Sequence, residues 1–176
     1  MMKHTHLGYS RPVLHNQLLT LYTNHRLPTL GSIQSMNKKY IWKPTDLGKA
    51  AEAVLKSSQR VSKIIMIQEF VVMPNHIHLL ISYRNHTPHI LNWFSTNCKQ
   101  AINACILNSR QETEPIWERS FHSIEVRHID TLRVICESLQ DHHSRWHYDL
   151  LYKDAQDAVL REKEKTYQQQ QLDIPT

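Results

Sequence analysis

Residues 73–80 read MPNHIHLL, in which two histidines flank one isoleucine and apolar residues lie on both sides. Apolar, β-branched runs of this kind favour a β-strand. Side chains two residues apart in a strand point to the same face. We therefore expect His76 and His78 to project side by side, with Ile77 on the opposite, packed face. Two parallel imidazoles on a strand are half of a divalent-metal site.

Outward from this strand, apolar periodicity and turn residues divide the chain into strands and helices. The expected strands cover residues 18–23, 63–73, 76–82 and 116–127, and the expected helices cover residues 45–59 and 89–108, with a third from residue 130 or 131 to Tyr148 or beyond. Residues 24–44 contain two prolines and one glycine and are expected to form an irregular connection. This order predicts an α+β fold with helices packed on an antiparallel sheet of four to five strands.

The length of 176 residues suits one domain with its own core. We expect a flexible basic arm over residues 1–14, the domain over residues 15–152, and a charged tail, helical or disordered, over residues 153–176. Three cysteines without C-x-x-C spacing argue against a disulfide framework and against structural zinc. A signal peptide and a membrane-length apolar run are both absent, so a cytoplasmic protein without a membrane partner is expected.

The charge balance favours a polyanionic partner. Lys and Arg number 21 against 16 Asp and Glu, which gives a formal charge of +5 at pH 7. Nucleic acid is the first candidate for such a partner, and a mildly basic enzyme is the alternative. Three glycines are too few for glycine-rich phosphate loops. The 13 histidines favour a metal site, although two solvated histidines on a strand face would give the same H-x-H pattern.

Two stretches together resemble a known family. Residues 69–81, EFVVMPNHIHLLI, resemble the histidine–hydrophobic–histidine (HUH) signature of single-tyrosine transposases, and the most similar branch is that of the REP-associated tyrosine transposases. Residues 116–122, IWERSFH, are similar to the family's W-Q-R-x-[YF] strand, and residues 124–127, IEVR, fit its segment ending in I-R. The resemblance covers roughly residues 16–145, and the first motif is the more specific of the two.

The resemblance implies an HUH-endonuclease architecture, which is ferredoxin-like or RRM-like. It also implies a protein that binds single-stranded or hairpin DNA and cuts and rejoins it with Mg²⁺ or Mn²⁺. In such proteins the metal stabilises charge on the phosphate, and a helix-borne tyrosine attacks the phosphorus to leave a 5′-phosphotyrosine and a free 3′-hydroxyl. Relatives resemble either monomers or homodimers, and both states stay open here.

The family tyrosine is missing from its expected position. Counted without gaps from Trp117, the tyrosine position falls on Ser138 and the additional metal-ligand position, four residues later, falls on His142. Residues four apart share a helix face, so His142 is expected to complete a metal site with His76 and His78. The alternative is that His142 only ends a helix, where cationic side chains suit the dipole.

Serine is a poor substitute for a phenol nucleophile because its alkoxide is far more basic and its side chain is shorter. Tyr148 is the preferred replacement, with Tyr152 as an alternative. Cleavage by a metal-bound water, without a covalent intermediate, and complete loss of cleavage also stay open.

Basic and aromatic residues are expected to contact nucleic acid outside the metal site. Phosphate contacts fix the position of DNA without reading its sequence, and exposed aromatics stack on unpaired bases. The candidates for phosphate contact are Lys38, Lys39, Lys43, Lys99, Arg119, Arg127 and Arg145. Trp42, which lies among lysines in an expected loop, is the candidate for stacking.

Three functions are therefore weighed. The first is an HUH transposase-like enzyme that cleaves and joins DNA strands. The second is a domesticated module of the same fold that binds structured DNA or RNA without turnover, and the loss of the tyrosine favours it. The third, an unrelated metallohydrolase that uses the same histidines, has the least support.

Overall fold

The computed structural model describes residues 14–37, 39–61, 64–84, 89–106 and 115–172. Four strands form one antiparallel sheet, in the order β4 (Ile65–Val72), β5 (His76–Arg84), β1 (Leu14–Thr23) and β6 (Trp117–Glu125). The prediction of an α+β fold built on an antiparallel sheet is confirmed. Residues 1–13 of the predicted arm, and Lys38, lie outside the described residues.

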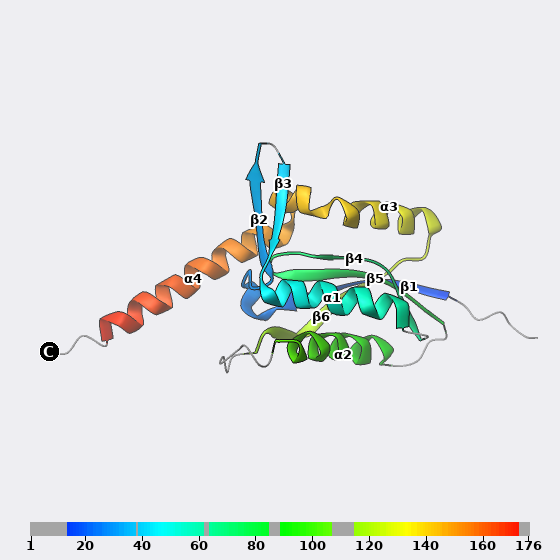
Figure 1. Ribbon diagram of the computed structural model, residues 1–176, viewed down its shortest axis with the longest axis horizontal. Helices are drawn as coiled ribbons and strands as arrows, with labels where there is room; N and C mark the ends of the chain where they lie inside the picture. The colour runs from blue at the N-terminus through cyan, green and yellow to red at the C-terminus, as the bar shows by residue number, and fades with distance from the viewer. Residues whose placement is uncertain (1–13, 38, 62–63, 85–88, 107–114, 173–176) are drawn as a thin grey trace, which may run out of the picture.

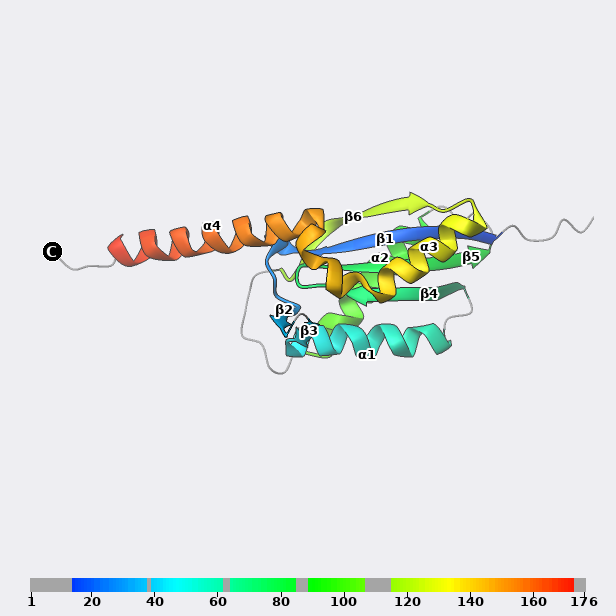
Figure 2. The same ribbon diagram turned by 90° about the horizontal axis from the view of Figure 1, so that it is seen from above.

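Helices cover both faces of this sheet (Figure 1, Figure 2). On one face lie α1 (Asp46–Val61) and α2 (Ile90–Ala104), and over the other face runs α3 (Ile129–Gln140). The apolar residues of α2 recur at helical spacing, and Phe94, Cys98 and Ile102 are buried against the sheet. The periodicity that predicted a helix from residue 89 to residue 108 thus marks its buried side.

Strand β5 divides its side chains between two separate cores. Ile77, Leu79 and Ile81 belong to the core beneath α1 and α2. Leu80 belongs to the second core, on the α3 face, together with Met73. Because alternate residues of a strand point to opposite faces, His76 and His78 lie on the same face as Leu80.

The expected irregular connection contains a β-hairpin, so that prediction is wrong. After a short 3₁₀ turn, η1 (Asn24–Arg26), strands β2 (Gly31–Met36) and β3 (Lys39–Pro44) pair as a separate two-stranded sheet. Gly31 and Pro44 pair with each other at the open end of the hairpin, where proline is tolerated. Glycine is needed there, because a Cβ on Gly31 would collide with the Trp42 ring.

The last predicted helix is also interrupted. Helix α3 ends at Gln140, a 3₁₀ segment η3 (His142–Tyr148) follows, and α4 (Leu150–Leu172) begins after one extended residue. Only the start of α4 packs, through residues that include Leu151 and Ala155, and the helix then projects away from the sheet (Figure 1). Within the described residues, no helix is both long enough and apolar enough to span a bilayer.

Candidate metal centre

Strand β5 brings His76 and His78 together as its alternation requires. Their ring centroids lie 4.5 Å apart, and Ile77 is buried in the opposite core. His76 is 0% exposed, whereas His78 is partly exposed. The geometric expectation of two adjacent imidazoles on one strand face is confirmed, and solvent reaches the pair at His78.

Burial keeps both rings in the form that binds metals. It lowers the pKa of His76 well below the ordinary value of 6.5, and the neighbouring His78 lowers it further. Burial, followed by the effect of His142, lowers the pKa of His78 to about 4. Both imidazoles are therefore neutral at pH 7, and only a neutral imidazole has a lone pair to donate to a metal.

Hydrogen bonds leave one nitrogen of each ring on β5 without a protein partner. His76 Nδ1 donates to Asn75 Oδ1 at 2.8 Å, and the Asn75 amide is oriented because its Nδ2 donates to the Leu151 carbonyl at 2.9 Å. His78 Nδ1 shares a 2.9 Å hydrogen bond with Oγ1 of Thr20, its partner on β1. This arrangement leaves the Nε2 atom of each ring available to a metal ion.

His142 joins the pair, but not by the expected route. Its ring centroid lies 5.1 Å from that of His78 and 6.3 Å from that of His76. It belongs to η3, after the end of α3, so the expectation that it shares one helix face with Ser138 is wrong. The break at Asp141, with φ −105° and ψ 13°, ends the helix before His142.

Asp149 is a further member that the sequence analysis missed. Its Oδ2 lies 2.9 Å from His142 Nε2 and 3.5 Å from His76 Nε2, and its side chain is 8% exposed. Burial by itself would raise its pKa, but the His142 hydrogen bond, the nearby His76 and the Leu151 N–H together lower it to about 2. An aspartate just before a run of helix-forming residues is a helix-start signal, and this signal could have indicated the position of Asp149.

These four side chains form a set that can hold a metal ion. One donor atom from each of His76, His78, His142 and Asp149 lies within 4.8 Å of the others. His76 Nε2 and His142 Nδ1 are buried and have no hydrogen-bond partner. Buried polar atoms are normally satisfied, so two orphaned ring nitrogens in one cluster fit an ion that would accept their lone pairs.

The residues considered as nucleophiles lie in different surroundings. Ser138 is half-buried in the last turn of α3. Tyr148 is 87% exposed and immediately precedes Asp149. Tyr152 packs against Trp146, with ring centroids 5.3 Å apart, and its hydroxyl accepts a hydrogen bond from Gln156. Of the two tyrosines, Tyr148 is the more exposed, and it is adjacent in the chain to Asp149.

The predicted phosphate contacts fall into two groups. Lys39 and Lys43 are exposed on β3, and Arg119 is exposed on β6. Lys38 lies outside the described residues, and the other three candidates have partners in the protein. Arg127 pairs with Glu125 at 2.7 Å, Arg145 pairs with Asp141 at 3.5 Å, and the Lys99 ammonium donates to the carbonyls of Glu118 and Ser120 at 2.6 and 3.2 Å.

Trp42 is not the loop aromatic that the sequence predicted. It lies in strand β3, and one face of its ring stacks on His143, with centroids 5.1 Å apart and an interplanar angle of 14°. Its indole N–H donates to Glu52 at 2.8 Å. Because residues 39–44 form a strand, the Trp42 ring faces the body of the protein. The surface with which this ring could stack on a base is therefore largely occupied.

Comparison with known proteins places the chain in a family. The family model of IS200-like transposases matches residues 34–142, whereas no curated protein matches. A solved structure of a REP-associated tyrosine transposase bound to a REP hairpin shares 14% identity and has a TM-score of 0.50, over 81% of this chain and 72% of that chain. A transposase crystal structure from Deinococcus radiodurans R1 shares 16% identity and has a TM-score of 0.47, over 80% of this chain and 97% of that chain. Because the family model spans more than half of the sequence, this protein belongs to the IS200-like transposase family.

Proposed function

We propose that this protein binds single-stranded or hairpin DNA beside a divalent-metal centre formed by His76, His78 and His142, and that this site serves metal-dependent strand cleavage and joining. The observation that carries the proposal is the convergence of three imidazoles, two on β5 and one on η3, in a transposase-family chain. A divalent cation there, Mg²⁺ or Mn²⁺ by family resemblance, would neutralise charge on a phosphate. The solved relative bound to a REP hairpin supports DNA as the partner.

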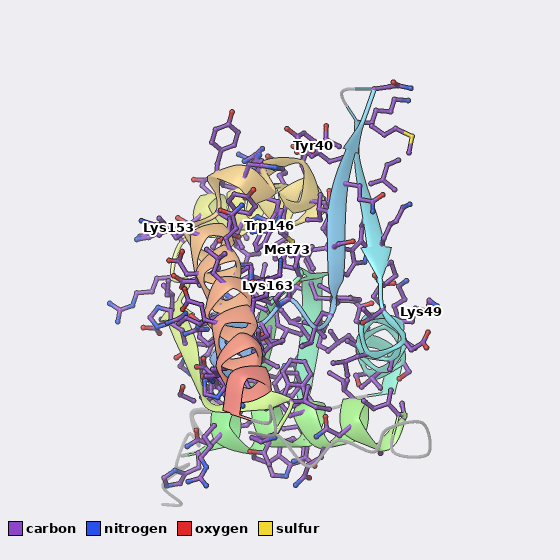
Figure 3. All side chains as sticks on the ribbon, turned by 90° about the vertical axis from the view of Figure 1, so that its left-hand side faces the viewer. Tyr40, Lys49, Met73, Trp146, Lys153 and Lys163 are labelled. Carbon is purple, nitrogen blue, oxygen red and sulfur yellow. The ribbon has the colours of Figure 1, made fainter. Side chains whose placement is uncertain are left out.

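The β2–β3 hairpin and the η3 segment offer a path for a strand toward these histidines. Figure 3 shows Tyr40 of the hairpin facing the η3 side, and its ring centroid lies 5.6 Å from that of His147. Lys39 and Lys43 add exposed cations to the same hairpin. Lys39 and Lys43 alternate with Tyr40 along β3 and so lie on its other face. Exposed cations and aromatics on one hairpin suit an unpaired strand, in which phosphates and base faces are both accessible.

Tyr148 is the residue that we assign to nucleophilic attack. Its phenol oxygen would form a bond to phosphorus while the bond from phosphorus to the 3′ oxygen breaks. The phenol gives up its proton, the departing 3′ oxygen takes up a proton, and the products are a 5′-phosphotyrosine and a free 3′-hydroxyl. The exposure of Tyr148 and its place next to Asp149 support this assignment.

A second candidate function is binding of structured nucleic acid without cleavage. The observation that favours it is the sequence of α3, IDTLRVICESLQ, which has Ser138 at the expected tyrosine position and contains no tyrosine. Such a protein would keep the basic hairpin and the histidine cluster without performing strand transfer.

A covalent-adduct assay separates the two functions. Hairpin-bearing single strands labelled at either end are incubated with the protein and Mn²⁺, and the products are run on denaturing gels. Strand cleavage by Tyr148 predicts a protein–DNA adduct that disappears in Tyr148→Phe and persists in Tyr152→Phe. Tight binding without adduct or cut strand would support the non-cleaving function, and absence of binding to DNA and RNA alike would refute both.

The path along the hairpin is tested by binding alone. Lys39→Ala and Lys43→Ala should each weaken single-strand binding and reduce the slope of log affinity against log salt by about 0.7, because each removes one phosphate contact. Lys49→Ala is the matched control, since Lys49 is exposed on α1 and pairs with Asp46. Fluorescence anisotropy in chelator measures these affinities independently of any metal. Equal losses in all three variants would contradict the path.

A further inference from the structure

The two carboxylate oxygens of Asp149 have different partners. Oδ1 accepts a hydrogen bond from the Leu151 N–H at 2.8 Å, as the residue before a helix commonly does. Oδ2 instead faces the histidines, at 2.9 Å from His142 Nε2 and 3.5 Å from His76 Nε2. One oxygen is therefore used by the start of α4, and the other points into the histidine cluster, where it hydrogen-bonds to His142.

Among the described residues, only histidines stand opposite the charge of Asp149. The side chain is 8% exposed, and within the described part of the chain no lysine or arginine forms an ion pair with it. A buried carboxylate needs a partner charge, and a cation at the centre of the cluster would supply it.

The donor set selects among metals. Three imidazole nitrogens and one carboxylate oxygen suit first-row transition metals, which bind nitrogen ligands well. Mg²⁺ prefers oxygen ligands, gives up its waters reluctantly and uses few protein donors. Donors bound to one ion at about 2.1 Å lie within roughly 4.2 Å of one another, so small movements from the observed spacing would complete the set.

The donors also come from two parts of the fold. His76 and His78 belong to β5, in the centre of the sheet, whereas His142 and Asp149 stand at the two ends of η3. An ion bound by all four would tie the 3₁₀ segment and the first turn of α4 to the sheet. Metal binding and the docking of this segment are then one equilibrium.

We propose that Asp149 is the fourth protein donor of this centre, that the centre selects Mn²⁺ or Zn²⁺ over Mg²⁺, and that the bound ion fastens residues 142–149 to strand β5. The inference rests on the proposed metal centre of His76, His78 and His142, and it does not depend on DNA cleavage.

The test is calorimetric titration of the chelator-treated full chain with Mn²⁺, Zn²⁺ and Mg²⁺ separately. We expect Mn²⁺ and Zn²⁺ to bind at least tenfold more tightly than Mg²⁺, and Asp149→Asn to lose about tenfold or more of the Mn²⁺ affinity. Asparagine is an equally good residue before a helix, so this variant keeps the hydrogen bond to Leu151. Asp154→Asn, exposed on the same helix, is the matched control and should bind like the unmodified protein.

Hydrogen exchange gives a second measurement that needs no enzymatic activity. Added Mn²⁺ should slow exchange of the amides in residues 142–152 of the unmodified chain, and should do so much less in Asp149→Asn. Equal affinity for Mg²⁺ and Mn²⁺, or unchanged Mn²⁺ binding and protection in Asp149→Asn, would overturn the inference while the histidine centre stands. Failure of His78→Ala to reduce metal binding would overturn the proposed centre as well, and DNA binding in chelator stays a separate measurement.

Discussion

At the scale of single residues, the Asn75 side chain orients the His76 ring and contacts the start of α4. It is fully buried, and its amide lies between the His76 ring and the Leu151 carbonyl. Its backbone carbonyl also accepts hydrogen bonds from the N–H and the hydroxyl of Thr23. One side chain thus fixes which nitrogen of His76 carries the proton and joins β5 to the start of α4.

We predict that Asn75→Ala weakens Mn²⁺ binding by about 10–100-fold, because the His76 ring loses the partner that sets its tautomer. The same change should cost roughly 1–3 kcal/mol of unfolding free energy, since two buried polar groups lose their partners. Asn75→Asp keeps an acceptor for His76 Nδ1 and should retain more of the metal affinity. Metal titration and urea unfolding measure the two effects.

Asn97→Ala is the control for this residue, because Asn97 is exposed on α2 and bonds only within its own helix. A metal affinity that stays the same in Asn75→Ala as in Asn97→Ala would show that the Asn75 side chain does not orient the ligand.

At the scale of secondary-structure elements, the Lys99 side chain covers part of the sheet edge formed by β6. Strand β6 is the last strand of the sheet, and the Lys99 ammonium on α2 donates to the carbonyls of Glu118, Arg119 and Ser120 along it. Burial lowers the pKa of this lysine. An edge strand with unpaired carbonyls is a template for pairing with other chains, and a lysine across it blocks such pairing.

We predict that Lys99→Met lowers the unfolding free energy by about 1–2 kcal/mol and increases self-association, because charge-assisted hydrogen bonds to β6 are lost. Its effect on single-strand affinity should be smaller than that of Lys43→Met. Urea unfolding, light scattering and anisotropy measure these three quantities. Lys49→Met, which removes only a surface ion pair with Asp46, should change stability by no more than about 0.5 kcal/mol.

The sequence-based role of Lys99 as a phosphate contact gives the opposite expectation. A variant Lys99→Met with unchanged stability and a loss of DNA affinity equal to that of Lys43→Met would restore that role.

At the scale of the whole molecule, the site joins a sheet to a C-terminal segment, and its histidines link folding to pH. The pKa of His78 is lowered from 6.5 to about 4, first by burial and then by His142. In the unfolded chain the same ring takes up a proton near its ordinary pKa. The unfolded state therefore binds more protons than the folded state between these values.

We predict that, in the metal-free protein, the contribution of His78 to the free energy of unfolding is complete above pH 6.5 and is lost as the pH falls toward 4. The loss from His78 alone is on the order of 3 kcal/mol, and the pKa of His76, lowered in the same direction, adds to it. Urea unfolding in chelator at a series of pH values measures the slope. His78→Gln should flatten it, and an unchanged slope in that variant would contradict the assignment.

The sequence pattern around residues 76–78 was enough to predict the two histidines that β5 contributes to the site. The alternation of side chains in a strand is a property of neighbouring residues, so the sequence alone placed His76 and His78 on one face and Ile77 on the other. The same holds for the apolar stripe of α2, whose spacing needs no knowledge of what it packs against. The family resemblance rested on these same local strings.

The positions of the other two members of the site were decided only by the tertiary structure. The end of α3, the 3₁₀ segment and the single extended residue Asp149 together determine that His142 and Asp149 meet β5. The same folding turns Trp42 onto His143 and directs Lys99 to the edge of β6. Each of these contacts joins residues distant in the chain, and its energy comes from packing and burial that no local pattern encodes.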